Sequence, residues 1–200
     1  MTEFEKGLLK YFCKEDLKKI QQTKIGIAGA GGLGSNCAML LVRSGFIHFT
    51  IVDFDRVEVS NLNRQNYVYS QVNQSKVAAL KENLAQIHSN VQIEAVEDRL
   101  TRDNIKEIFS SCDIVIEAVD CPETKAMIIE ELAQAGKYIV AASGLAGWGN
   151  SDRIKVKKIN DRLYIVGDLI STIENNPPCA PVVTLTASKQ ADLVLEIVLQ

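Results

Sequence analysis

Four glycines near the N-terminus have the spacing of a phosphate-binding turn. Gly29, Gly31 and Gly34 form the pattern G-x-G-x-x-G, and Gly32 adds a glycine inside it. The pattern follows a short apolar run and leads into a segment of helical periodicity that includes Ser35. Backbone N–H groups and a helix N-terminus can then face one phosphate. The turn predicts a bound nucleotide, and the alternative is a turn that serves only the fold.

Polar residues that could bind the rest of a nucleotide follow the next predicted strand. Asp53 comes about 20 residues after the glycines, where a Rossmann unit places a carboxylate against the ribose hydroxyls. The polar segment 53–66 is too long for a simple turn, and its candidate ligand-binding side chains are Asp55, Asn61, Arg64 and Gln65. Loops beyond strand ends often carry chemistry, although Asn and Ser also serve as caps and turn residues.

Two further charged residues complete the candidate set. Lys76 falls in the first turn of a helix predicted over 73–88, and it is either a solvated lysine or a phosphate ligand that reaches back to the glycines. Asp120 ends an apolar run over 113–119 that is typical of a buried parallel strand. Its carboxylate suits magnesium, which prefers oxygen ligands beside substrate phosphates, or else it caps the following helix.

The same residues help to decide between two nucleotides. A dehydrogenase would need an acid or base for hydride chemistry, but the chain has no Tyr-x-x-x-Lys pattern, and neither His48 nor His88 is well placed for that role. An ATP-using enzyme needs cations for the triphosphate and a carboxylate for magnesium. Arg64, Lys76 and Asp120 supply them, so we expect ATP and Mg²⁺.

Alternating strand and helix patterns predict the scaffold that positions these residues. We expect an α/β, Rossmann-like fold: a mostly parallel open sheet with helices on both faces and a short antiparallel C-terminal extension. Residues 1–200 are expected to form one domain, with an N-terminal helical segment over 1–22 and a long irregular loop over 167–181. The predicted strands are 24–28, 46–52, 91–96, 113–119, 138–142, 153–156 and 162–166. The predicted helices are 4–22, one directly after the glycines, 73–88, 101–110, 122–136 and 183–199.

Composition excludes several classes of protein. The 200 residues carry a net charge of −3 with scattered Lys and Arg, so we expect no nucleic-acid partner. No apolar run is long enough for a bilayer and no signal-peptide core is present, so we expect a cytoplasmic protein without membrane contact. The five cysteines are widely spaced and contain no C-x-x-C pair, which argues against a disulfide framework and against zinc.

The motifs together resemble a known family. Residues 29–35, the Asp53-Phe54-Asp55 triplet, the Ser60–Gln65 stretch, Lys76 and Asp120 are similar to the ThiF/MoeB/HesA family of the ubiquitin-activating-enzyme superfamily. The segments 142–149 and 164–168 resemble its short ThiF-like subgroup, so the resemblance covers nearly the whole chain.

The resemblance implies a specific reaction and partner. A ThiS-like β-grasp sulfur-carrier protein would be adenylated at its C-terminal glycine carboxylate, with release of pyrophosphate, in thiamine biosynthesis. A homodimer is also implied. In this family pattern Asp53 holds the ribose, the glycine-turn amides fix the nucleotide, and Asp120 holds magnesium. The phosphates would be held and neutralised by Asn61, Arg64, Gln65 and Lys76.

The chain also departs from the family pattern. The paired C-x-x-C zinc motifs are absent, and no arginine precedes Arg43, so the N-terminal arginine that relatives send into a partner's site is missing; Lys10 or Lys14 could replace it. Cys179 lies in the region where some relatives have an acceptor cysteine. It is either that acceptor thiol or an incidental buried thiol.

Other functions stay open on the sequence alone. The acceptor could instead be a molybdopterin-synthase carrier or a modified tRNA carboxylate. An NAD(P)-dependent oxidoreductase is a second class. A third is a non-catalytic subunit that binds a carrier or forms a dimer.

Overall fold

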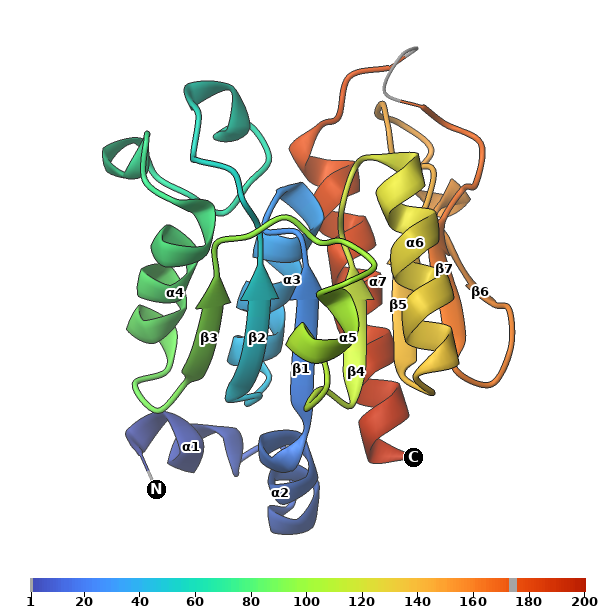
Figure 1. Ribbon diagram of the computed structural model, residues 1–200. Coiled ribbons are helices and arrows are strands. Elements are labelled where there is room, and N and C mark those ends of the chain that lie inside the picture. Colours follow the sequence, from blue (N-terminus) through green and yellow to red (C-terminus); the bar gives the residue numbers. More distant parts are fainter. Residues whose placement is uncertain (1, 173–175) are drawn as a thin grey trace.

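The computed structural model describes residues 2–172 and 176–200, and within them one sheet of seven strands organises the chain. The strand order is β3-β2-β1-β4-β5-β7-β6 (Figure 1). The strands are β1 (Lys24–Ala28), β2 (His48–Val52), β3 (Gln92–Val96), β4 (Ile114–Glu117), β5 (Tyr138–Ala142), β6 (Lys155–Lys158) and β7 (Leu163–Gly167). All neighbouring pairs are parallel except β6 and β7. The predicted fold class is confirmed.

The position of β1 explains where a ligand can bind. The chain runs from β1 outward through β2 to β3, and then returns to place β4 on the other side of β1. Loops leaving β1 and β4 therefore diverge from a shared sheet edge, which creates the crevice where open α/β sheets bind ligands. In Figure 1 the carboxyl ends of the parallel strands point toward the top, where the long loops gather.

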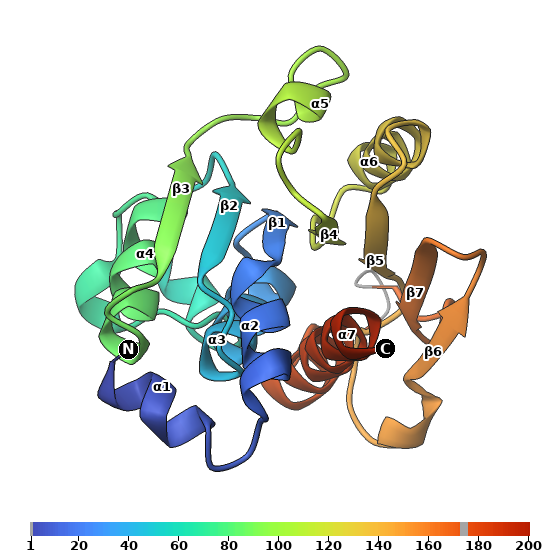
Figure 2. The ribbon, with the colours of Figure 1, turned by 90° about the horizontal axis from the view of Figure 1, so that it is seen from below.

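Helices cover both faces of the sheet (Figure 2). They are α1 (Glu3–Leu8), α2 (Lys14–Gln22), α3 (Gly32–Arg43), α4 (Lys76–Ile87), α5 (Ile105–Ile108), α6 (Pro122–Gln134) and α7 (Ala180–Leu199). One apolar core lies between the sheet and α3, α4 and α7, and a smaller one lies under α5 and α6. Among the described residues, no helix is both long and apolar enough to cross a lipid bilayer.

The N-terminal segment differs from the single helix predicted over 4–22. Two helices form, α1 and α2, separated by a break around Tyr11. Cys13 ends the break because its Sγ accepts a hydrogen bond from the N–H of Asp16 and caps α2. Tyr11, inside this break, is 86% exposed. The first residue of the predicted 1–22 segment lies outside the described residues.

Other helix ends also moved from their predicted positions. Helix α4 begins at Lys76 rather than at 73, because Asn73 has a left-handed φ of 72° and Ser75 pairs with Arg56 in a β-bridge. The helix predicted over 101–110 is shorter in the structure, where only α5 (Ile105–Ile108) forms. Helix α7 begins at Ala180, with Pro181 in its first turn. Within the predicted loop 167–181, residues 173–175 lie outside the described residues.

The C-terminal extension is the predicted antiparallel hairpin. Strand β6 pairs with β7, and the side-chain oxygen of Asn160 accepts hydrogen bonds from the N–H groups of Arg162 and Leu163 in the turn. Strand β6 forms the outer edge of the sheet and is exposed along its length, with three lysines in four residues.

Candidate functional site

The glycine turn is shaped by two positions that admit no side chain. Gly29 has φ 97°, and a Cβ there would lie 2.8 Å from the carbonyl oxygen of Ala118 on the neighbouring strand end. A Cβ on Gly34 would overlap the carbonyl of Gly29 itself. The chain can therefore pass from β1 into α3 within one tight turn only because both residues are glycine.

The other two glycines face residues that were expected to bind the nucleotide. The Nε2 of Gln65 lies 3.8 Å from the position of a Cβ on Gly31, and the Cγ of Arg64 lies 3.5 Å from one on Gly32. The Oε1 of Gln65 is buried and has no hydrogen-bond partner among the described residues. This side of the turn thus brings the Gln65 amide and the aliphatic part of the Arg64 side chain to the glycines, while the Arg64 guanidinium donates to the carbonyl of Ser60 and to the Oδ1 of Asn63.

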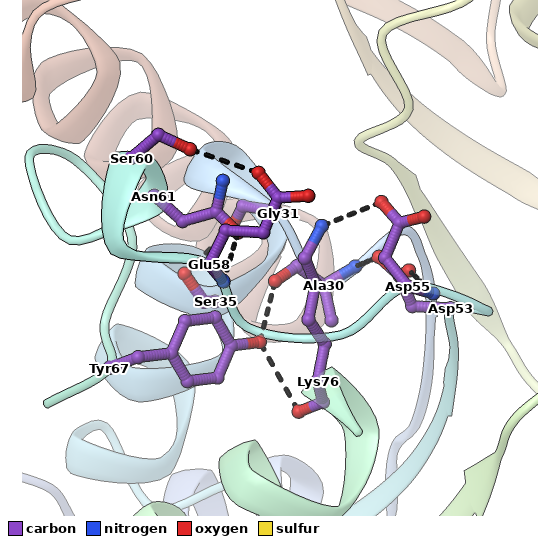
Figure 3. A network of polar contacts seen from close by, with 10 residues as sticks. All are labelled: Ala30, Gly31, Ser35, Asp53, Asp55, Glu58, Ser60, Asn61, Tyr67 and Lys76. Carbon is purple, nitrogen blue, oxygen red and sulfur yellow. Dashed lines mark hydrogen bonds and ion pairs between the residues drawn. The ribbon is translucent and has the colours of Figure 1, made fainter. Parts of the chain in front are cut away.

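Asp53, Asp55 and Lys76 form one connected network beside the turn (Figure 3). Asp53 accepts hydrogen bonds from the N–H groups of Ala30 at 2.6 Å and Asp55 at 2.8 Å. Lys76 pairs with Asp55 at 2.7 Å, and its side chain is only 7% exposed. Burial raises the pKa of Asp53, against the lowering effect of these N–H groups and of Lys76. A cation and two carboxylates are therefore held within reach of the turn before any ligand arrives.

Tyr67 is a site residue that sequence reasoning missed. Its buried hydroxyl donates to the carbonyl of Ala30 at 2.7 Å and also lies 3.3 Å from the carbonyl of Lys76 (Figure 3). Burial, and then the nearby Asp53, raises the pKa of this phenol, so it stays protonated as a donor. Tyr67 links the glycine turn to the start of α4. No local pattern distinguishes it from a core tyrosine.

Ser35 and Asn61 are occupied with structural bonds. The fully buried Ser35 hydroxyl donates to the carbonyl of Gly31 and accepts from the N–H of Asn66. The Oδ1 of Asn61 accepts from the N–H of Glu58 in its own turn. Their nucleotide contacts stay predictions, and in this structure both residues hold the loop that carries Arg64 and Gln65.

Asp120 lies on the opposite side of the turn. Its exposed carboxylate has no hydrogen-bond or ion-pair partner among the residues that the structure describes. The preceding residue, Val119, places its Cγ1 3.3 Å from the Cβ position on Gly29. Asp120 is therefore next to the glycine turn and free to bind a ligand.

Cys179 reaches the same region from the C-terminal part of the chain. It is the residue before α7, and Val183 in the first turn of that helix lies 3.0 Å from the Cβ position on Gly32. The neighbouring Pro178 accepts a hydrogen bond from Asn63 at 3.4 Å. The thiol is partly buried, and among the described residues its one polar contact is a long one, to the carbonyl of Pro177 at 3.7 Å. Its role as an acceptor stays a prediction.

A second missed pair stands at the end of β4. Glu117 is fully buried and pairs with Lys125 of α6 at 2.5 Å. The sequence contained a signal for it: a carboxylate inside an otherwise apolar strand needs a partner, because burying an unpaired charge is costly.

Comparison with known proteins gives consistent matches. The model of the ThiF family matches residues 5–200. The adenylyltransferase and sulfurtransferase UBA4 of Lodderomyces elongisporus is 36% identical over 133 residues, which are 66% of this chain and 29% of that protein. A sulfur carrier protein adenylyltransferase of Thermus thermophilus is 33% identical over 127 residues, or 63% of this chain and 47% of that protein. The chain spans less than half the length of either relative.

Among solved structures, the fold matches over nearly its whole length. The E. coli tRNA N6-threonylcarbamoyladenosine dehydratase TcdA, in complex with AMP, has a TM-score of 0.88 at 22% identity and covers 97% of this chain and 93% of its own. A second structure of the same protein contains ATP. At this identity the likeness establishes the fold.

Proposed function

The chain belongs to the ThiF family, and on that premise we propose that it adenylates the C-terminal glycine carboxylate of a ThiS-like β-grasp sulfur-carrier protein. ATP supplies the adenylyl group, pyrophosphate is released, and the reaction serves thiamine biosynthesis. Two observations on relatives support this proposal: two of them are described as adenylyltransferases, and a structural neighbour binds AMP and ATP.

One observation carries the proposal: the buried Lys76 is held by Asp55 beside the glycine turn. A lysine that is 7% exposed at the start of a helix opposes the helix dipole and gives up hydration. A bound triphosphate would offset both costs, because its negative charge would interact with Lys76 in place of, or together with, the Asp55 carboxylate. Arg64, beside Gly32, would supply the second cation.

The chemistry needs charge neutralisation and alignment more than it needs a base. An oxygen of the carrier carboxylate forms a bond to the α-phosphorus of ATP, and the bond from that phosphorus to the bridging oxygen of the β-phosphate breaks. Both reactants are anionic, so Arg64 and Lys76 would act by neutralising the phosphates. The glycine-turn amides and Gln65 would hold the phosphate groups, and Asp53 would accept the ribose hydroxyls through its remaining lone pairs.

Asp120 fits the expected magnesium. Mg²⁺ is often bound through one or two carboxylates together with substrate phosphates and water. An exposed carboxylate without an internal partner, next to the turn, matches that donor set. When bound, the ion would neutralise phosphate charge.

The partners are proposed from one relative and from the family resemblance. The Thermus thermophilus relative is described as a sulfur carrier protein adenylyltransferase, which supports a carrier as the partner. The choice of ThiS, the homodimer, and Cys179 as a thiol that receives the activated carrier rest on the family resemblance.

Exchange of labelled pyrophosphate into ATP tests the reaction. We expect exchange with a ThiS-like carrier and none with the same carrier lacking its terminal glycine. Exchange only with a molybdopterin-synthase carrier would replace the proposed substrate by that carrier. Absence of exchange with any β-grasp carrier, together with thermal protection by NAD but not by Mg-ATP, would overturn the proposal in favour of an oxidoreductase.

A further inference from the structure

Glu117 and Lys125 form a buried ion pair at the end of β4. Glu117 is 0% exposed and Lys125 is 22% exposed at the side chain. Burial raises the pKa of Glu117, and the charge of Lys125 opposes that effect. Buried pairs of this kind are often no more stabilising than apolar residues of similar volume. Stability alone therefore does not explain the pair.

Glu117 and Lys125 both form a hydrogen bond with the backbone of Val119. Glu117 accepts a hydrogen bond from the N–H of Val119 at 2.9 Å, and Lys125 donates to the carbonyl of Val119 at 3.2 Å. The two polar groups of one residue are thus bound from a strand and from a helix. Glu117 also lies 3.5 Å from the N–H of Ala142, the last residue of β5.

Val119 is the residue that joins the glycine turn to Asp120. The carbonyl of Ala118 and the Cγ1 of Val119 both pack against Gly29, at 2.8 and 3.3 Å from its Cβ position. Asp120 comes next and is exposed, without a partner of its own among the described residues. Its carboxylate is therefore oriented through the backbone on either side of it, which is Val119 before it and Cys121, the N-cap of α6, after it.

We propose that Glu117 and Lys125 are positioning residues, which clamp the backbone of Val119 and so hold the Asp120 carboxylate at the nucleotide's metal ion. The inference rests on the proposed function, because it gives Asp120 the metal. Neither residue needs to contact the nucleotide for this role. Their effect is on the geometry of Asp120, as that of a carboxylate's supporting hydrogen bonds is in other metal sites.

The chain offers a matched control on the same helix. Glu131 of α6 is 10% exposed at the side chain and pairs with Arg102 and with Lys106, the latter at 2.6 Å. These two ion pairs join α6 to α5 and to the segment before it, away from Val119. Glu131→Gln therefore removes two partly buried ion pairs from α6 and leaves the clamp intact.

The first experiment measures ATP binding by calorimetry over a series of Mg²⁺ concentrations. Lys125→Met removes the charge and the bond to the carbonyl of Val119, and we expect it to raise the half-saturating Mg²⁺ concentration about 10-fold or more. Lys125→Arg keeps a cation and a hydrogen-bond donor, so its half-saturating Mg²⁺ concentration should stay close to that of the wild type. Glu131→Gln should leave the Mg²⁺ dependence unchanged.

The second experiment needs no nucleotide. Amide hydrogen exchange over residues 118–121 should become faster in Lys125→Met and stay as in the wild type in Glu131→Gln. If Lys125→Met does not fold, the double variant Glu117→Gln/Lys125→Met removes both charges together and should fold, since no buried charge is left unpaired.

The two experiments separate the possible failures. Unchanged Mg²⁺ dependence and unchanged exchange in the lysine variant, or equal changes in Glu131→Gln, would overturn the clamp. If ATP does not bind to the wild type at all, the proposed function fails. In that case the exchange measurement still decides whether the pair holds this loop.

Discussion

The two sides of the glycine turn differ in how their polar groups are bound. On one side, three largely buried residues are held by short polar contacts. Asp53 and Tyr67 both hydrogen-bond to the backbone of Ala30, and Lys76 forms an ion pair with Asp55. On the other side, Asp120 has no partner among the described residues and Cys179 has only one long contact. The first side is preorganised by the fold, and the second presents free groups to whatever binds. Substitutions should therefore cost stability on the first side and activity alone on the second.

The largest effect is expected at Asp120 and Arg64. Asp120→Ala and Arg64→Ala should each lower the rate of carrier-dependent adenylation by at least about 100-fold, the scale for removing one preorganised charge-stabilising group. Because Asp120 supports no other residue, the unfolding free energy of Asp120→Ala should stay within about 0.5 kcal/mol of the wild type. Pyrophosphate release and urea unfolding measure the two quantities. A rate near that of the wild type would show that Asp120 is outside the site.

The next effect is on the fold of the turn itself. Gly34→Ala places a Cβ on the carbonyl of Gly29, so we expect a loss of about 2–3 kcal/mol in the free energy of unfolding. Gly7→Ala in α1 is the control, since its Cβ would meet nothing within 4 Å in a helical backbone. Chemical denaturation compares the two. Equal stability of the variants would contradict the described turn.

A smaller loss should follow from removing one hydroxyl. Tyr67→Phe leaves the carbonyl of Ala30 without its buried donor and should cost about 1–2 kcal/mol of stability. Tyr69→Phe, a neighbour that is 75% exposed, should change stability by less than about 0.5 kcal/mol. If both variants unfold alike, Tyr67 does not link the turn to α4.

The smallest expected effect is a pH dependence of the unfolding free energy, caused by His88 at the C-terminal end of α4. His88 follows this helix, is fully buried beside Phe4 and Glu5 of α1, and has its pKa lowered by burial. The unfolded chain therefore binds a proton more readily than the folded one. Stability should be complete above about pH 6.5 and fall as the pH drops below that value.

Urea unfolding at several pH values between 7.5 and 5 measures this dependence. His88→Gln cannot take up the proton and should show a shallower loss of stability over the same range. A wild-type slope equal to that of the variant would mean that the histidine accepts its proton without cost in the folded state.

Features set by local sequence could be predicted. The apolar run before Gly29, the glycine spacing and the acid at Asp53 fall within one βαβ unit, where spacing along the chain fixes spacing in space. The antiparallel C-terminal extension was likewise predicted, from the two short strand patterns over 153–156 and 162–166.

Features set by distant contacts could not. The helix predicted over 4–22 breaks because Cys13 caps a new helix, a local competition that apolar periodicity does not reveal. Tyr67 acquires its role from Ala30, and Lys125 from Glu117, and only the folded chain brings these residues together. The sequence also could not show that the Asp120 carboxylate lacks a partner among the described residues, because an acid at a strand end often caps the next helix.

Strand β6 has a consequence for the whole molecule. Its outer side is the open border of the sheet, where unpaired backbone groups could recruit a strand from another chain. Lys155, Lys157 and Lys158 line this strand and are exposed. Docking an identical border against it would bring ammonium groups together and strip them of water. The lysines thus disfavour aggregation by pairing of β6 strands from two molecules.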